Sequence, residues 1–113
     1  MDNCIFCKII SGDIPSRKVY EDDDTLAFDD INPQAAVHTI VIPKKHLSNI
    51  VELSCDSDDM MAKLIKSCVR VAEIKGIRET GFRTVNNCGE NAGQTVMHVH
   101  MHVLGYSERN EKL

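Results

Sequence analysis

The sequence predicts an α+β fold with a mostly antiparallel five-stranded sheet, one long helix and one short N-terminal helix. Five short segments are β-branched or alternate apolar with polar residues, and one long segment has helical periodicity. The strands fall into groups instead of alternating strictly with helices, which is typical of α+β folds. At 113 residues the chain can bury one hydrophobic core but not two. We therefore expect a single domain over residues 1–113, with a flexible tail from about residue 107.

The first elements are predicted to be a short helix and a hairpin. Apolar side chains recur at helical spacing within residues 4–10, and Gly12 follows where this helix should end. Residues 17–21 and 25–28 are short strand candidates. The acidic segment 22–24 lies between them, which favours a hairpin.

A buried strand and the longest helix follow. Residues 38–42 are β-branched and end at Pro43, so they predict a strand that begins with His38. From residue 56 or 57 to residue 75 the apolar side chains lie on one helical stripe, and Gly76 comes just past the end. This segment predicts the long helix.

The C-terminal third is predicted to contain two strands joined by a polar loop. Residues 82–86 form the first strand candidate, and residues 87–93 form a loop that contains glycine. Residues 97–104 then alternate histidine with apolar residues. In a strand this places His98, His100 and His102 on one face and Val99, Met101 and Val103 on the other.

Three interpretations of this histidine row compete. A metal site needs further ligands, and Val103 and Leu104 follow the row where a metallohydrolase would carry an aspartate. In a catalytic site the neighbours of the central His100 would hold one tautomer, leaving one ring nitrogen free to attack an electrophile. A histidine row that has neither a catalytic nor a metal-binding role is disfavoured, because buried polar groups without partners are costly.

Composition excludes several classes of function. The content of 42% hydrophobic and 27% charged residues is that of a soluble globular protein, and no apolar run approaches the ~18 residues of a membrane span. The net charge of −4 lacks the basic surplus used to bind long nucleic acids. Residues 1–10 do not resemble a signal peptide, so we expect a cytoplasmic, reducing location.

The five cysteines, an odd number, are expected to be free thiols or metal ligands. Cys4 and Cys7 form a CxxC pair that can converge on one metal ion, although zinc needs about four ligands and no second CxxC exists. The pair also suits a redox couple or two buried small residues. Cys68 lies on the apolar stripe of the long helix and is expected in the core.

The block from Gln94 to Leu104 resembles the signature of the histidine triad (HIT) superfamily, in which histidines alternate with hydrophobic residues. The similarity to its Hint branch, the histidine triad nucleotide-binding proteins, covers almost the whole chain. It includes residues 4–10, 20–24, 26–31, 33–35 and 41–47. The resemblance implies hydrolysis of the P–N bond of purine nucleoside phosphoramidates, such as adenosine monophosphate amides. It also implies homodimers whose sheets join into one.

By this resemblance His100 is the nucleophile that takes the nucleotidyl group before water releases the nucleoside monophosphate, and His38 and His102 are its catalytic neighbours. Phosphoryl transfer depends on positioning and charge stabilisation, which imidazoles can supply. Asp30 matches the acid that binds the ribose hydroxyls, a suitable role for a carboxylate. The same residue alone would suit a turn before Asn32.

The resemblance also assigns the rest of the nucleotide site. Asn87 and Thr95 match positions at the phosphate end, and Gln94 is expected to add a polar contact. An apolar pocket around the base is implied, although each of its members also suits an ordinary core. These residues are Ile5, Phe6, Ile9, Ile14, Phe28 and Ile31.

Many bacterial relatives bind a structural zinc ion through such a cysteine pair and two histidines. One histidine follows the Pro-Lys-Lys run and the other is the first of the triad. The implied ligands here are Cys4, Cys7, His46 and His98. The other three candidate histidines would then carry the chemistry, with no cofactor needed for catalysis.

Two alternatives stay open. Residues 94–96 also occur in the dinucleoside polyphosphate hydrolase branch, so that activity is one alternative. A nucleotide-binding interaction module with incidental hydrolysis is the other. The tail lacks the tryptophan and proline ending of some animal relatives, so the resemblance does not define the leaving group.

Overall fold

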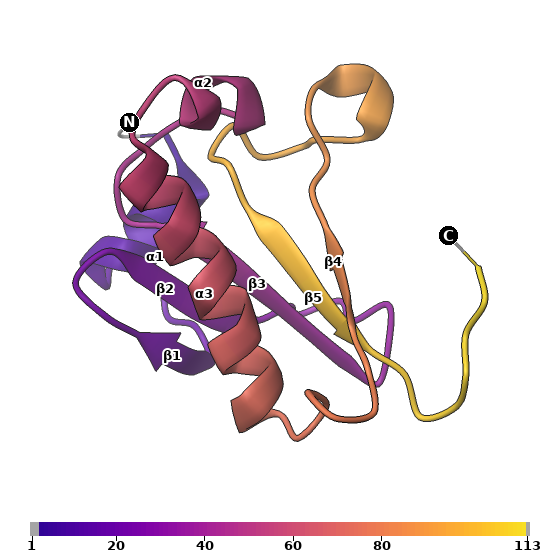
Figure 1. Cartoon of the computed structure of the whole chain (residues 1–113). Helices are drawn as coiled ribbons and strands as arrows, with labels where there is room; N and C mark the ends of the chain where they lie inside the picture. The colour runs from indigo at the N-terminus through magenta and orange to yellow at the C-terminus, as the bar shows by residue number, and fades with distance from the viewer. Residues whose placement is uncertain (1–2, 113) are drawn as a thin grey trace.

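A five-stranded antiparallel sheet with strand order β1-β2-β3-β5-β4 organises the molecule (Figure 1). The structure is a computed structural model that describes residues 3–112. In chain order the elements are α1 (Ile5–Ser11), β1 (Lys18–Glu21), β2 (Thr25–Asp29), β3 (Val37–Pro43), α2 (Ile50–Ser54), α3 (Asp58–Ile74), β4 (Arg83–Val85), the 3-10 helix η1 (Glu90–Ala92) and β5 (Met101–Gly105).

Helix α3 covers one face of the sheet. Its stripe of buried side chains, centred on Leu64 and Cys68, packs against Val41 of β3 and Val103 of β5. The helix begins where the Ser57 hydroxyl accepts the N–H of Met60, and its last turn is followed by Gly76 at a φ of 74°. These contacts form the larger of two hydrophobic clusters.

Helix α1 lies on the other face and forms a second, smaller cluster. Phe6 and Ile9 of α1 pack on Phe28 of β2 and on Ile40 and Ile42 of β3. Since side chains alternate along a strand, the residues between these point to the α3 face. The second face is also the one that His38 shares, so α1 lies next to the histidines.

The predicted fold class is confirmed, and two short helices, α2 and the 3-10 helix η1, were not predicted. Helix α2 has Asn49 as its N-cap, which accepts the N–H of Glu52, while the Glu52 carboxylate accepts the N–H of Ser48. This reciprocal pattern is a capping signal that the sequence contains. Its five residues show too little periodicity to predict a helix by spacing.

The last strand begins later than predicted. Met101 is the first residue of β5 that is paired, opposite Val41, so His98 and His100 precede the ladder and only His102 lies in the strand. The reason is that β3 ends at Pro43, which has no N–H to donate, and its carbonyl accepts the side chain of His98 instead.

Within residues 3–112, none of the helices combines the length and the apolar character needed to cross a bilayer.

Candidate functional site

His38 and His102 form a hydrogen-bonded pair whose tautomers follow from a backbone group. The N–H of Gln34 donates to His38 Nδ1 over 3.0 Å, so this nitrogen carries no proton. The proton of His38 is therefore on Nε2, which lies 2.8 Å from Nδ1 of His102. We accordingly assign His102 as an acceptor at Nδ1 and a donor at Nε2.

His100 has the complementary arrangement. Its Nδ1 donates to the carbonyl oxygen of His98 over 2.8 Å, which leaves Nε2 with a free lone pair. The ring is buried against Phe6 in an edge-to-face contact, with ring centroids 5.1 Å apart, and lies at the same centroid distance from His102. The unprotonated Nε2 of His100 therefore belongs to a ring that lies beside the His102 ring, which presents an N–H donor.

Burial keeps the flanking histidines neutral. It lowers the pKa of His102 to about 4, and the charge interactions with His100 and His38 act in the same direction. Burial likewise lowers the pKa of His98 to about 4. Both rings are therefore uncharged near neutral pH, which for His102 agrees with the tautomer assigned from its hydrogen bond.

Four side chains from distant parts of the chain converge beside this row. Cys4, Cys7, His46 and His98 each offer one donor atom, and all four atoms lie within 4.8 Å of one another. Cys7 Sγ is 3.3 Å from His46 Nδ1, and Cys4 Sγ is 3.4 Å from His98 Nδ1. The structure thus brings together the four residues that the resemblance implies as zinc ligands.

The donor set fits a zinc ion. Two sulfur and two imidazole ligands are a common tetrahedral zinc set. His98 Nε2 donates to the Pro43 carbonyl over 2.8 Å, so its Nδ1 lone pair points toward the thiols in the tautomer that a metal requires. Burial and the adjacent Cys4 raise the pKa of Cys7 to about 11, and a bound cation would offset this by stabilising the thiolate.

Asp30 lies at the edge of the histidine pair. One carboxylate oxygen accepts the N–H of Asn32 over 2.8 Å, which closes the turn expected from the local sequence. The other oxygen is 3.4 Å from His38 Nε2 and has room for a further donor, since the side chain is 19% exposed. The turn interpretation is therefore confirmed, and the ribose interpretation stays a prediction.

The family model for the HIT domain matches residues 11–109. The chain belongs to the HIT family. Protein hit of Bacillus subtilis is 47% identical over 107 residues, covering 91% of this chain and 70% of its own length. The purine nucleoside phosphoramidase of Escherichia coli K12 is 39% identical over 104 residues, covering 92% of this chain and 87% of that protein. The solved structure of a HIT family hydrolase from Clostridium thermocellum is 43% identical and superposes with a TM-score of 0.94, covering 100% of this chain and 98% of that one.

The loop residues that we predicted at the phosphate end of this HIT protein differ in their bonding. Thr95 is exposed before the histidine row. The amide of Asn87 donates to the Ala92 carbonyl over 2.9 Å, so it holds the loop around η1. Gln94 is buried, and its amide binds the N–H of Gly89 and two backbone carbonyls. Gln94 thus organises the loop that presents Thr95.

The six residues predicted for the base pocket of the HIT site divide into two groups. Phe6, Ile9 and Phe28 are buried together, and Ile14 packs against them. Ile5 is 46% exposed and Ile31 is 90% exposed, so neither side chain belongs to this buried cluster. The buried apolar cluster therefore lies next to His100 through Phe6, and Ile5 and Ile31 expose their side chains to solvent.

Several functional groups of the site were not found from sequence. They are main-chain atoms, namely the N–H of Gln34, the carbonyl of Pro43 and the carbonyl of His98, and one side chain, Asn86. Main-chain groups carry no signal of residue type, so only the fold reveals them. Asn86 was predicted as an ordinary strand residue.

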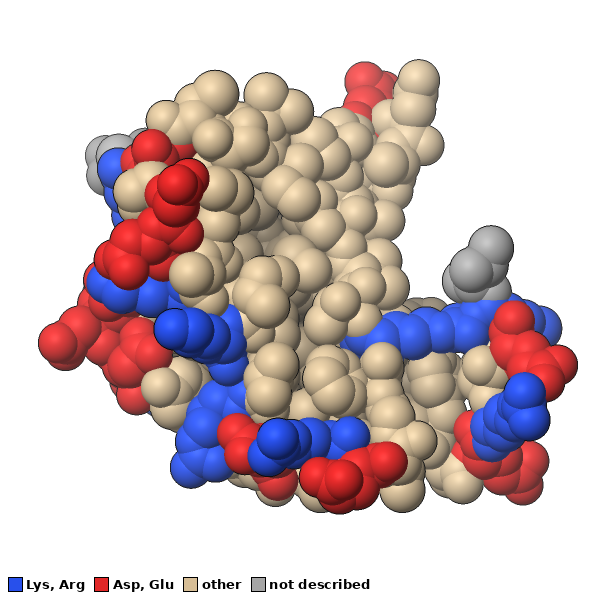
Figure 2. Space-filling view, viewed as in Figure 1, with Lys and Arg blue, Asp and Glu red and all other residues tan. Residues whose placement is uncertain are grey.

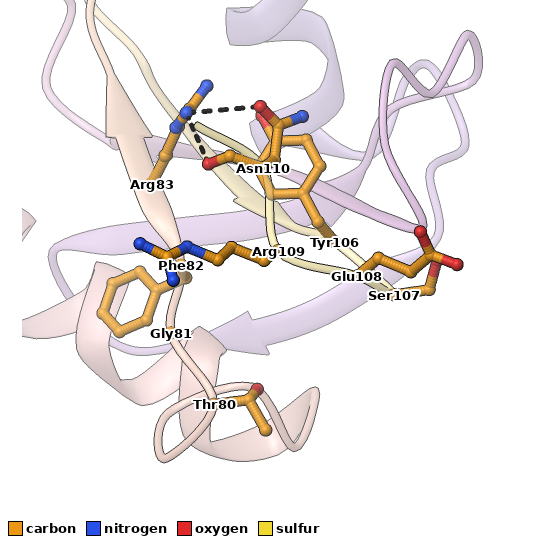
Figure 3. A pocket seen from close by; sticks show the side chains of 9 residues that line it. All are labelled: Thr80, Gly81, Phe82, Arg83, Tyr106, Ser107, Glu108, Arg109 and Asn110. Carbon is orange, nitrogen blue, oxygen red and sulfur yellow. Dashed lines mark hydrogen bonds between the residues drawn. The ribbon is translucent and has the colours of Figure 1, made fainter. Parts of the chain in front are cut away.

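A separate cavity of about 660 Å³ lies between β4 and the C-terminal tail of the HIT domain (Figure 3). Arg83 extends over the ring of Tyr106, 5.3 Å from its centroid, and donates to the carbonyl and side-chain oxygens of Asn110. The residues that line this cavity include no histidine or cysteine. It therefore contains none of the candidate catalytic or metal-binding histidines and cysteines.

Proposed function

We propose that this HIT protein is a nucleotide-binding hydrolase that cleaves the P–N bond of purine nucleoside phosphoramidates through a covalent intermediate on His100. One observation carries the proposal: His100 Nδ1 donates to a backbone carbonyl, so its Nε2 lone pair is free beside the His102 ring. A neutral imidazole held in one tautomer is an effective nucleophile. The name of the Escherichia coli relative supports the choice of substrate class.

The proposed reaction has two displacement steps. His100 Nε2 attacks the phosphorus, the P–N bond to the substrate amine breaks, and the leaving nitrogen takes a proton from solvent and departs as a free amine. Water then attacks the phosphorus, the bond to Nε2 breaks, and nucleoside monophosphate and a proton are released. The His102 Nε2–H donor is suited to stabilise the charge on the phosphoryl oxygens in both steps.

Further residues would hold the nucleotide for this reaction. The accessible oxygen of Asp30 is a suitable acceptor for ribose hydroxyls. The apolar cluster around Phe6 would pack against the purine, with Ile31 as an accessible apolar contact. Thr95 would contact the phosphate end.

We propose a structural role for zinc at Cys4, Cys7, His46 and His98. When bound, zinc would link the N-terminal helix to the segment that precedes β5, and no step of the hydrolysis passes through it. All five cysteines are free thiols in the structure. A reducing location such as the cytoplasm would maintain this ligand set.

We also propose a homodimer. The strand β4 has only β5 as a neighbour among the described residues, so its outer edge is available for pairing. One flank of α3 carries the exposed apolar side chains Ile65 and Val69, and Val51 of α2 is 60% exposed. Figure 2 shows that the centre of this side of the molecule has few charged side chains, which lie mainly along its left, lower and right margins. An open strand edge and an exposed apolar surface each favour association with a second copy.

The test of the hydrolase is a substrate panel with mass detection of the adduct. We expect turnover of a fluorogenic adenosine phosphoramidate and an adenylyl adduct on His100 in rapidly quenched samples. The variant His100→Gln should bind adenosine monophosphate but neither turn over nor form the adduct. Equal turnover by this variant would contradict the mechanism. Preference for dinucleoside polyphosphates, or tight binding without turnover, would instead support one of the two alternative functions.

A further inference from the structure

The main chain at His100 lies outside the regular sheet. Pairing between β3 and β5 ends at Met101, and pairing between β4 and β5 ends at His102. The residue proposed as nucleophile therefore lacks the ladder hydrogen bonds that hold the strand after it. A catalytic ring on an unpaired segment needs other contacts to fix its position.

Single hydrogen bonds replace the ladder there. The N–H of Val99 donates to the Leu47 carbonyl over 2.7 Å. The carbonyl of His100 accepts the side-chain amide of Asn86 over 2.9 Å. Asn86 directly follows Val85, the last residue of β4, at the point where that strand separates from β5. A side-chain amide thus supplies the donor that a continuing strand would supply from its main chain.

The hydrogen bond from Asn86 and the hydrogen bond that holds the imidazole ring both act on His100. His100 is 7% exposed, so without Asn86 its carbonyl would be a nearly buried acceptor without this partner. The ring is held at Nδ1 by the His98 carbonyl, and the main chain is held at its own carbonyl by Asn86. Two anchors on one residue fix both the backbone and the direction of Nε2.

Neighbouring asparagines do not share this role. The side chain of Asn87 donates to Ala92 within the loop. Asn91 is exposed in η1. Asn86 is half-buried and makes its bond across fourteen positions of sequence to the nucleophile itself.

We propose that Asn86 is a positioning residue that holds the His100 backbone so that Nε2 faces the phosphorus. This inference rests on the proposed function of His100. A purely structural role, in which Asn86 only joins the loop to β5, would affect stability but not the transfer step. The two roles therefore differ in which measured quantity changes.

The first measurement is the single-turnover rate of adenylyl transfer to His100. We expect Asn86→Ala to lower this rate about 10- to 100-fold, while the Kd for adenosine monophosphate changes less than about two-fold. Asn86→Asp has the same shape but turns an oxygen toward the carbonyl, and should lower the rate at least as much. Asn86→Asp takes the place of Asn86→Ala in this measurement if the alanine variant does not fold. Asn91→Ala is the matched control and should transfer at the wild-type rate.

The second measurement does not require activity. The hydrogen-bonded Nδ1 proton of His100 gives a low-field NMR signal that can be assigned by its loss in His100→Gln. We expect this signal to shift or broaden in Asn86→Asp, while the Nε2 proton of His98, bonded to Pro43, keeps its position. Wild-type transfer rates and an unchanged His100 signal in both Asn86 variants would overturn the inference. Absence of adenylyl transfer in the wild-type protein itself would instead overturn the proposed function, together with the positioning role.

Discussion

The Nε2 atom of His38 lies 2.8 Å from the Nδ1 atom of His102, and this bond joins the histidine of β3 to the row that leads into β5. Because the N–H of Gln34 occupies the other nitrogen of His38, the proton can lie only between the two rings. His38 thereby determines that His102 presents Nε2–H to the site. Through this pair the fold sets the tautomer of a histidine that lies next to the proposed nucleophile, His100.

Removing this bond should lower the rate without loss of binding. In His38→Ala the Nδ1 atom of His102 loses its donor, and the ring can carry its proton on either nitrogen. We expect kcat for an adenosine phosphoramidate to fall about 10- to 100-fold, with the Kd for adenosine monophosphate changed less than about three-fold. Steady-state kinetics and calorimetry measure the two quantities. An unchanged kcat would show that the tautomer of His102 is not important.

The pKa of His102 predicts how stability depends on pH. Burial lowers it to about 4 from the ordinary value of 6.5, so between these values the unfolded chain binds more protons than the folded one. The free energy of unfolding should therefore fall as the pH is lowered from about 6.5 toward about 4. Urea denaturation across this range measures the loss.

The variant His102→Gln provides the comparison for the pH prediction. Glutamine does not titrate, so the variant should lose less stability over the same pH range. The buried His98 also has a lowered pKa and contributes to the loss in both proteins, which leaves the difference between them to His102. Parallel curves for the two proteins would exclude His102 as a source of the pH dependence.

The pattern of the sequence was sufficient for most of the fold. Alternation predicted that Val99, Met101 and Val103 pack away from the histidines, and all three lie in the α3 cluster. The helical stripe predicted α3 to within two residues at its ends. The start of β5 could not be predicted, because it depends on Pro43 of another strand and on the side-chain bond that replaces its ladder.

For the candidate site, the sequence identified side chains but not their protonation. The CxxC spacing marked Cys4 and Cys7 as a pair. That this pair lies beside His46 and His98 followed only from resemblance, since residues up to ninety-four positions apart give no spacing signal. The tautomer of each histidine depends on a main-chain N–H or carbonyl that any residue type supplies. Such groups become visible only when the fold places them.

Asp30 should discriminate between ribose and deoxyribose. The amide oxygen of Asp30→Asn can still close the turn to Asn32, but the negative charge near His38 is lost. We expect the wild-type protein to prefer adenosine monophosphate over its 2′-deoxy form by about 10-fold or more, and the variant by less than about three-fold. Binding calorimetry with the two nucleotides measures the preference.

A neighbouring carboxylate is the control for the ribose prediction. Asp29 binds Thr39 and Lys75, away from the histidine pair. Asp29→Asn should keep the full preference for the ribonucleotide. If both variants keep it, Asp30 is a turn residue only.

Zinc removal should destabilise the protein. We expect elemental analysis of the native protein to find about one zinc per chain, and chelation to lower Tm by about 10 °C or more. Cys7→Ser should lose the metal, because it removes one of the four converging ligands. Cys55 is an exposed thiol outside this cluster, so Cys55→Ser should keep both metal and Tm. A metal-free native protein with a Tm insensitive to chelator would contradict the site.

The two flanks of α3 allow a matched test of the homodimer. The flank toward β1 carries Lys63, which forms ion pairs with Asp24 and Asp59. The other flank carries Ile65 and Val69, which lie four positions apart and therefore on one side of the helix. Ile74 is also exposed but lies nine positions after Ile65, which places it about 180° away around the helix.

A charge on the apolar flank should therefore separate the subunits. We expect the wild-type protein to elute with twice the chain mass by size exclusion with light scattering. Ile65→Glu should shift it toward the monomer, because a carboxylate buried in an interface without a partner is costly. Ile74→Glu adds the same charge to the same helix on the opposite side and should remain a dimer. Dissociation by Ile74→Glu instead would place the interface on the charged flank, and a monomeric wild-type protein would exclude the dimer.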